Sequence, residues 1–364
     1  MFRLRFAPVA EQSHHDARIA AVALAPFKQR RKLLTFVNVE HLAVSREAMT
    51  EFIWEIRERQ LQRGTQTAVG VVTFHPEPNR ICELIALISE QALAILVYAN
   101  SPIDDELQTR LRAHAGRTPM HIIGGGNNCG LGIAYNTLVQ WAVKIDARYL
   151  LLFDQDSTPP REMIVRLEEA VKTLAKLGTR PAMVGPQPIT ENTDRFKISQ
   201  RRQPTPNGTL IPVDFVISSG AMIVLEAAQS VGRFREDYFI DVIDIEWCLR
   251  AWHAGWSVWL ARDLQMVHRL GRGIIRLPFG IEITDQPPRR LYTYLRNQLA
   301  MLRLKHVPWS RKLRIAVSLP VKCGIYIVRN GFSRAVITAV ATGLWHGTLN
   351  KLGPPHRVWK RIEN

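Results

Sequence analysis

The sequence predicts an α/β fold built on a mostly parallel, doubly wound sheet. Between residues 67 and 153, short runs of aliphatic and β-branched residues alternate with segments whose apolar positions recur at helical spacing. The last of these runs, 149–153, is apolar throughout, as expected of a strand covered on both faces. Two carboxylates, Asp154 and Asp156, follow it directly. Such a sheet binds its ligands at the carboxyl ends of its strands.

The elements follow one another in a regular order from residue 67. The β-branched run at 67–74 predicts the first strand, 80–91 a helix and 92–100 a second buried strand. A helix at 104–114, a short strand at 120–123 and a helix from about 131 to 146 precede the strand at 149–153. Right-handed crossovers between these strands give a doubly wound sheet, so we expect a nucleotide-binding half-domain.

Three regions are expected along the 364 residues. Residues 1–67 form an N-terminal extension in which only 45–60 predicts a capped helix. Residues 68–286 form the α/β domain, and 287–364 form a basic helical region. The four cysteines form no CxxC pair, which argues against a structural zinc site or a disulfide framework. The absence of paired cysteines fits a protein of the reducing cytoplasm. The N-terminus also lacks the pattern expected of a secretory signal peptide.

Positive charge is concentrated at the C-terminus. The net charge is +16, and residues 287–364 carry 15 Lys and Arg against one acid. Such asymmetry indicates an anionic partner, either a nucleic acid or a membrane. Aromatic residues are sparse among the basic ones, so nucleic acid is not expected as a partner.

A basic amphipathic helix is predicted at 289–305, where leucines recur at helical spacing and arginines fall elsewhere around the helix. Such a helix can lie on an anionic bilayer, or it can pack on its own domain with a solvated basic edge. The apolar runs at 314–329 and 335–345 fall short of the ~20 residues that a spanning helix needs. We therefore expect attachment to a membrane surface, without a transmembrane segment.

Asp154 and Asp156 are separated by one residue, and two acids this close repel each other unless a cation lies between them. A divalent metal is therefore predicted here, and oxygen ligands suit Mg²⁺ or Mn²⁺. The glycine-rich stretch at 124–136 is no dinucleotide fingerprint, because Cys129 stands where a third glycine is needed. It favours a sharp turn and close approach of the backbone to a ligand.

A second acidic stretch, at 234–256, contains Asp241, Asp244 and Glu246 among aromatic and aliphatic residues. On a helix Asp241 and Asp244 would share a face, and desolvation would raise their pKa values toward those of a general base. Alternatively these are ordinary helix-start charges, with Glu246 paired to Arg250 at i,i+4. His268 follows, and a lone histidine is more often structural than metal-binding.

Taken in order, these motifs resemble the family 2 glycosyltransferases, which are inverting enzymes with the A-type nucleotide-diphospho-sugar transferase fold. More narrowly, they resemble bacterial rhamnosyltransferases that build O-antigen and other surface polysaccharides. The resemblance covers about residues 68–305. The segments that carry it are VVTFHP, NNCGLGIAYN, FDQDS, ISSGAMIV, FIDVIDIEWCLRA and RNQLAML.

The resemblance implies a role for each matching residue. Asp156 would hold Mg²⁺ or Mn²⁺, with Asp154 near the metal and the nucleotide ribose and His268 as a third ligand. Asp244 falls at the position of the catalytic base, and Asp241 is its rival because Ile243 replaces an acid found in many members. The donor site would comprise Thr73, His75, Asn100, Asn128, Gly130, Asn136 and Asp154. The acceptor side would comprise Ser219, Gly220, Glu246 and Trp247.

The resemblance also implies a reaction, the transfer of rhamnose from dTDP-rhamnose to a glycan acceptor linked to polyprenyl diphosphate. The place would be the cytoplasmic face of the plasma membrane. Ala99 and Phe74-His75 depart from residues that members often use at the donor site, which leaves a UDP-hexose or UDP-galactofuranose as an alternative donor. Two alternatives belong to other functional classes: a nucleic-acid-binding protein with a degenerate transferase core, and a scaffold without catalytic activity. The oligomeric state stays open.

Overall fold

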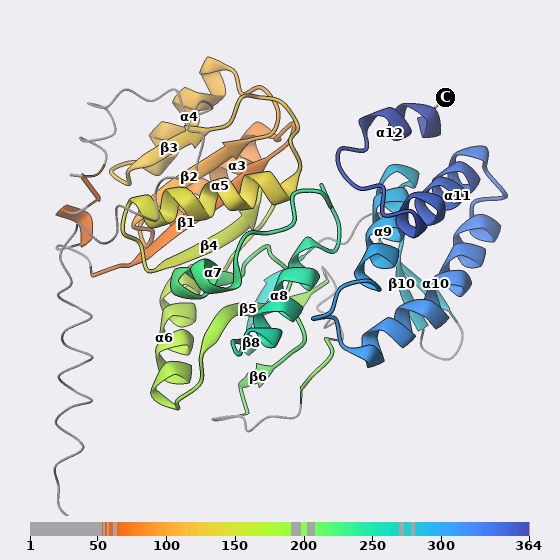
Figure 1. The fold of residues 1–364 in the computed structure, drawn as a ribbon. Coiled ribbons are helices and arrows are strands. Elements are labelled where there is room, and N and C mark those ends of the chain that lie inside the picture. The colour runs from red at the N-terminus through yellow and green to blue at the C-terminus, as the bar shows by residue number, and fades with distance from the viewer. Residues whose placement is uncertain are drawn as a thin grey trace, which may run out of the picture. The chain divides into compact units, whose positions relative to one another are not determined.

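The computed structural model describes residues 64–190, 198–201, 208–268, 273–277 and 281–363, together with parts of a helical segment between residues 53 and 60. These residues belong to one compact unit, which joins the sheet and the C-terminal helices (Figure 1). The helix predicted at 45–60 is therefore described only in part. The rest of the predicted N-terminal extension up to residue 63 lies outside the described residues.

An eight-stranded sheet forms the centre of the fold, in the order β3-β2-β1-β4-β7-β5-β8-β6. Its strands are β1 (Thr67–Thr73), β2 (Ala94–Ala99), β3 (Met120–Ile123), β4 (Tyr149–Asp154), β5 (Pro181–Ile189), β6 (Leu210–Pro212), β7 (Met222–Val224) and β8 (Ser257–Val267). Strands β1 to β4 pair in parallel, as do β5 and β8. Strands β6 and β7 pair antiparallel to their neighbours. The predicted α/β class with a mostly parallel sheet is confirmed.

The helices of the sheet domain are α3 (Pro78–Ser89), α4 (Asp105–Ala115), α5 (Leu131–Lys144), α6 (Met163–Lys176), α7 (Leu225–Val231) and α8 (Ile243–His253). Local signals explain where two of them begin. Pro78 starts α3 with its backbone angle already set for a helix, and Asp104 caps α4 by accepting a hydrogen bond from the N–H of Leu107 at 2.8 Å. Helix α5 lies across β1 and β4 (Figure 1).

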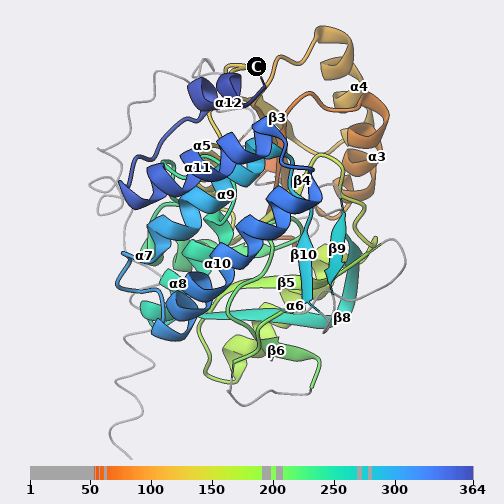
Figure 2. The same cartoon turned by 90° about the vertical axis from the view of Figure 1, so that its right-hand side faces the viewer.

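The C-terminal region adds a β-hairpin and four helices. Strands β9 (Ile274–Leu277) and β10 (Ile281–Thr284) form the hairpin, followed by α9 (Pro288–Met301), α10 (Trp309–Arg329), α11 (Arg334–Thr348) and α12 (His356–Glu363). These elements share a second hydrophobic core. Figure 2 shows α10 and α11 side by side in front of α9.

Helix α9 corresponds to the amphipathic helix predicted at 289–305. Its Leu291 and Leu295 are fully buried in the second core, so the helix packs on its own protein, one of the two arrangements that the sequence left open. Helix α10 continues through Pro320 for 21 residues, longer than the apolar run at 314–329. In the described part of the chain, no helix combines the length and the apolar character that a membrane crossing requires.

Candidate active site

The carboxyl ends of β1, β2 and β4 bring polar residues together that lie far apart in the sequence. The side-chain amide of Gln155 donates a hydrogen bond to the carbonyl of Phe74 (3.1 Å), and its oxygen accepts one from the N–H of Phe74 (2.6 Å). The N–H of Asn100 donates to the carbonyl of Thr73 (2.9 Å). The middle residue of the Asp-Gln-Asp motif therefore fixes the segment after β1 beside Asp154 and Asp156.

The residues predicted for the nucleotide at β1 and β2 lie at this edge. Thr73 is buried and donates its hydroxyl to the carbonyl of Tyr98 at 3.3 Å. His75 is exposed, with φ of 47°, and its N–H donates to the hydroxyl of Ser101 at 2.7 Å. The buried Asn100 accepts a hydrogen bond from the N–H of Cys129 at 3.1 Å, so it anchors the glycine-rich loop.

The glycine-rich loop approaches protein backbone closely. Asn128 accepts a hydrogen bond from the N–H of Gly130 at 3.1 Å, and Gly130 has φ of 85°. A Cβ at Gly130 would lie 2.6 Å from the carbonyl oxygen of Phe239, and one at Gly132 would lie 2.4 Å from that of Arg235. The close approach that the sequence predicted toward a ligand is thus made toward the segment before α8.

Asn136 also forms its hydrogen bonds with the segment before α8. It is buried, donates to the carbonyl of Phe234 at 2.9 Å and to the Glu236 carboxylate at 2.8 Å, and accepts from the N–H of Phe234 at 2.7 Å. These contacts use both the nitrogen and the oxygen of the side-chain amide. Asn136 therefore holds the segment before α8 in place. Its predicted contact with the nucleotide sugar stays a prediction.

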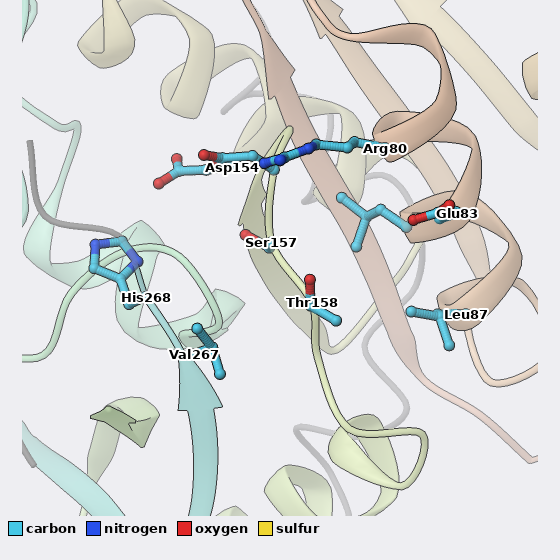
Figure 3. A pocket seen from close by; sticks show the side chains of 10 residues that line it. Arg80, Glu83, Leu87, Asp154, Ser157, Thr158, Val267 and His268 are labelled. Carbon is cyan, nitrogen blue, oxygen red and sulfur yellow. The ribbon is translucent and has the colours of Figure 1, made fainter. Parts of the chain in front are cut away.

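A pocket of about 300 Å³ opens beside the Asp-Gln-Asp motif. A β-bridge between Thr158 and Val267 brings the end of β8, and with it His268, next to the loop after β4. Figure 3 shows side chains from α3, from this loop and from the end of β8 around the pocket. The lining residues are Arg80, Glu83, Leu84, Leu87, Asp154, Asp156, Ser157, Thr158, Val267 and His268.

The three predicted metal ligands therefore share one pocket. Burial raises the pKa of Asp154 to about 6, the Asp156 charge adds to the increase, and Arg290 opposes it. Burial lowers the pKa of His268, although Asp156 and Asp244 act in the other direction. Among the described residues, no group of three or more His, Cys, Asp or Glu side chains is spaced to hold a metal ion by itself. A metal here would need further oxygen ligands.

The two candidate bases have different surroundings. Asp241 lies just before α8 with φ of 69°, so it does not share a helix face with Asp244 as the sequence predicted. The Asp241 carboxylate is held by Arg290, whose Nε lies 3.1 Å away, and by the hydroxyl of Thr293 at 2.6 Å. Its charge is therefore paired within the protein.

Asp244 lies in the first turn of α8 and is half-buried. It accepts hydrogen bonds from the backbone N–H groups of Ile245 (2.8 Å) and Ser218 (3.4 Å). Burial raises the pKa of Asp244, the backbone hydrogen bonds lower it, and the charge of Asp154 raises it further. The balance lies above the ordinary value, which suits a carboxylate that takes up a proton.

The segment that leads into α8 is unusual because Phe239, Asp241 and Val242 all have positive φ. Left-handed conformations of non-glycine residues are costly and persist only where the surroundings enforce them. The buried side chain of Asn297 donates to the carbonyls of Tyr238 (3.1 Å), Ile240 (2.8 Å) and Asp241 (2.9 Å). Helix α9 therefore fixes the backbone that presents Asp244.

Arg296 supports the same segment from the neighbouring position on α9. Its guanidinium is buried and donates to the carbonyls of Tyr238 and Gly353, both at 2.8 Å. Arg296 and Asn297 begin the RNQLAML segment, so the structure assigns this pair to holding the loop before α8.

The predicted acceptor-side residues divide into two groups. Ser219 lies beside Asp154, because its hydroxyl accepts from the N–H of Asp154 at 3.2 Å and lies 2.7 Å from that of Ser157. Gly220 has φ of 81°, and a Cβ there would lie 2.8 Å from the Met266 side chain. Both therefore belong to the wall beneath the Asp-Gln-Asp motif.

Glu246 and Trp247 point into the protein. Glu246 is 1% exposed and binds Arg250 through two hydrogen bonds of 3.0 and 2.9 Å, the i,i+4 pair that the sequence offered as the alternative. Burial alone would raise the pKa of Glu246, but His306 and Arg250 outweigh it and lower the pKa. Trp247 is fully buried and donates to the carbonyl of Gly232 at 2.9 Å. In this structure neither side chain is presented to an acceptor.

Arg290 is one of the residues that the sequence analysis did not place in the site. It binds Asp241, and its charge acts on Asp154, Asp244 and His268. In the sequence Arg290 was one of the arginines of the amphipathic helix predicted at 289–305, and these indicated a basic surface rather than an active site.

The mostly parallel sheet, the two aspartates at the end of β4 and Asp244, whose pKa is raised by burial, agree with the A-type glycosyltransferase fold that the sequence motifs resemble. The chain is 30% identical over 252 residues to the dTDP-rhamnosyl transferase RfbF of Shigella flexneri. The matched region covers 68% of this chain and 83% of that protein. The chain belongs to the rhamnosyltransferase-like family 2 glycosyltransferases and is a nucleotide-sugar glycosyltransferase. No protein-family model matches it.

Solved structures agree on the fold. Residues 1–349 of S. aureus TarS in complex with UDP-GlcNAc superpose with a TM-score of 0.52 at 14% identity, covering 78% of this chain and 80% of that one. Another TarS structure gives a TM-score of 0.50 at 15% identity and covers 81% of this chain. The match spans only 50% of that longer TarS chain.

Proposed function

We propose that this glycosyltransferase moves rhamnose from dTDP-rhamnose to a glycan acceptor linked to polyprenyl diphosphate, with inversion at the anomeric carbon. The donor follows from the similarity to a dTDP-rhamnosyl transferase. The observation that carries the catalytic assignment is the contrast between two carboxylates. Asp241 is paired with Arg290 and Thr293, whereas Asp244 is half-buried with a raised pKa and accepts its hydrogen bonds from backbone N–H groups.

In the proposed reaction, Asp244 takes the proton from the acceptor hydroxyl. The acceptor oxygen forms a bond to the anomeric carbon while the bond from that carbon to the diphosphate oxygen breaks, so one displacement inverts the centre. The pKa of Asp244 is raised by burial, which makes its carboxylate a stronger base than an exposed aspartate. Asp241, in this scheme, holds Arg290 near the negative charges of the site.

Asp154 and Asp156 would hold Mg²⁺ or Mn²⁺, with His268 as the third ligand. The raised pKa of Asp154 fits this role, because a cation would relieve the repulsion from Asp156. Magnesium commonly binds one or two carboxylates together with substrate phosphates, which suits a site with two adjacent aspartates. When bound, the ion supplies positive charge that stabilises the departing nucleotide diphosphate.

The proposed place of action is the cytoplasmic face of the plasma membrane. Residues 287–364 carry 15 basic side chains against one acid, which favours an anionic lipid surface. A polyprenyl-linked acceptor would be held at that surface. A nucleic-acid partner has less support, because aromatic residues that could stack on bases are sparse among these basic residues.

Calorimetric titration with dTDP-rhamnose, UDP-glucose and UDP-galactose, with and without Mn²⁺, tests the donor and the metal. We expect metal-dependent binding of dTDP-rhamnose that Asp156→Ala abolishes. Binding of a UDP-sugar in its place would reassign the donor, and binding unaffected by Mn²⁺ would contradict the metal site.

The base is tested separately with two matched variants. Asp244→Asn should retain donor binding and lose about 10²–10⁴-fold in transfer rate. Asp241→Asn should retain part of the transfer activity but unfold at lower urea concentration, because it removes the charge of the buried carboxylate that binds Arg290 and Thr293. If Asp241→Asn abolished transfer at full stability while Asp244→Asn did not, Asp241 would be the base.

A further inference from the structure

The outward face of α10 is apolar along the length of the helix. Leu313, Val317, Val321 and Val328 are between 56% and 65% exposed, and their spacing places them on one side of the helix. Trp309, 77% exposed, begins the helix. The opposite side supplies Ile315, Leu319, Cys323 and Tyr326 to buried positions. Helix α10 is thus apolar on two sides, and only one of them is buried against the protein.

Helix α11 adds a second exposed apolar row. Ile337, Trp345 and Leu349 are 42%, 61% and 44% exposed and recur at intervals of four or eight residues. Helices α10 and α11 contact each other and both contact α9, and Figure 2 shows them side by side. We call these two rows, together with Phe332 in the turn between the helices, the outer surface of the C-terminal helices.

An apolar surface of this extent requires an explanation. Single exposed hydrophobic side chains are ordinary, but contiguous apolar patches on soluble proteins commonly mark a site of interaction with a protein or a membrane. Because α10 already contributes its other side to the second core, packing within the protein does not account for the exposed row.

The charge of these helices indicates which partner binds the surface. Arg314, Arg329 and Arg334 are exposed on the same two helices, and the whole region carries a large positive excess. Two copies of this surface would bring like charges together, which opposes self-association. Anionic lipid headgroups complement these arginines, and each basic residue near such a bilayer contributes about 1 kcal/mol. The exposed tryptophans of the two rows, Trp309 and Trp345, also suit the membrane interface.

We propose that the outer surface of the C-terminal helices docks on an anionic lipid bilayer. Helix α10 lies in the plane of the membrane, its apolar row enters the boundary between headgroups and acyl chains, and the flanking arginines contact lipid phosphates. This specifies the membrane partner of the proposed function by named residues. It does not depend on which nucleotide sugar the enzyme uses.

The arrangement connects the membrane to the active site through α9. One part of α9 packs against α10 and α11, while Asn297 on the same helix holds the loop that presents Asp244. Helix α9 therefore contacts both the helices of the docked surface and the loop that presents Asp244. The amphipathic helix predicted at 289–305 is thus the link between the site and the two helices that we propose to meet the lipid.

Sedimentation of the full chain with lipid vesicles tests the docking. Vesicles of phosphatidylcholine alone are compared with vesicles that also contain phosphatidylglycerol. The double variant Val317→Ser, Val321→Ser removes apolar area from the α10 row, and Val165→Ser is the matched control because Val165 is 50% exposed on α6. We expect the wild type and the control to bind the anionic vesicles and the double variant to bind at least about tenfold more weakly.

Donor binding and urea unfolding are measured on the same samples, so that misfolding and failure of the proposed chemistry are recognised separately. A double variant that binds vesicles as tightly as the wild type would overturn the proposal. So would a wild type that ignores anionic vesicles and forms a dimer that the double variant converts to a monomer. Either result leaves the measured donor binding, and with it the proposed transfer reaction, unaffected, whereas a wild type that ignores anionic vesicles would also contradict the proposed place of action.

Discussion

Replacing Asp154 by Asn is predicted to stabilise the protein at neutral pH, and the size of the effect follows from the surroundings of this carboxylate. Burial and the neighbouring charge of Asp156 raise the pKa of Asp154 from 3.8 to about 6. The ionised form is therefore less favourable in the folded protein than in the unfolded chain. Asparagine has nearly the same shape and carries no charge, so it removes this penalty.

The sign and the pH range follow from linkage. Because the folded pKa lies above the unfolded value, the contribution of Asp154 to stability is complete below about pH 4 and is lost as the pH rises through about 6. A shift of about two pKa units corresponds to about 3 kcal/mol, at 1.36 kcal/mol per unit. The stability gain of Asp154→Asn should thus be near zero at pH 4 and about 3 kcal/mol at pH 8.

Urea unfolding of wild type and variant across this pH range, with a chelator present, measures the difference directly. Glu83→Gln is the control, because Glu83 lines the same pocket and is exposed, so it should change the free energy of unfolding by less than about 0.5 kcal/mol. Added Mn²⁺ should stabilise the wild type more than Asp154→Asn, since ligand binding favours the folded state. A stability difference that does not change with pH would refute the reasoning.

Two further substitutions test the loop that presents Asp244. Gly132→Ala should lower the free energy of unfolding by about 3 kcal/mol, because the added Cβ would lie 2.4 Å from the carbonyl oxygen of Arg235, while Gly125→Ala meets nothing within 4 Å and should be neutral in the same urea titration. Asn297→Ala removes three hydrogen bonds to backbone carbonyls and should cost about 3 kcal/mol. Its transfer rate should fall more than its donor affinity, and an unchanged rate would show that the loop is fixed without Asn297.

The sequence predicted the first half of the sheet well because its signals are local. The strands β1 to β4 are apolar runs separated by amphipathic helices, and their predicted bounds differ from the observed ones by one or two residues. Strands β6 and β7 have three residues each, too few to show a period, so their antiparallel insertion had no local signal. Such pairings are decided by tertiary contacts.

For the site, the sequence identified the acidic residues and the Glu246–Arg250 pair, but not the partner of Asp241. Asp154, Asp156 and His268 line one pocket as the motif order suggested, and Asp244 lies in a setting that raises its pKa. The partner of Asp241, Arg290, lies 49 positions further along the chain. A spacing rule based on helical periodicity therefore placed Asp241 beside Asp244, whereas the left-handed backbone at Asp241 turns it toward α9.

The left-handed segment before α8 explains why the C-terminal helices belong to the same compact unit as the sheet. Three non-glycine residues with positive φ cost on the order of 1–3 kcal/mol each, so the segment needs partners, and the sheet domain supplies some of them through Asn136 and Leu131. Arg296 and Asn297 supply further partners from α9.

Removing residues 287–364 would therefore release this strained backbone as well as any membrane contact. Loss of activity after such a truncation would not identify the membrane as its cause. The substitutions at Val317 and Val321 change the outer surface while leaving α9 and its hydrogen bonds in place, and for that reason they separate docking from the positioning of Asp244.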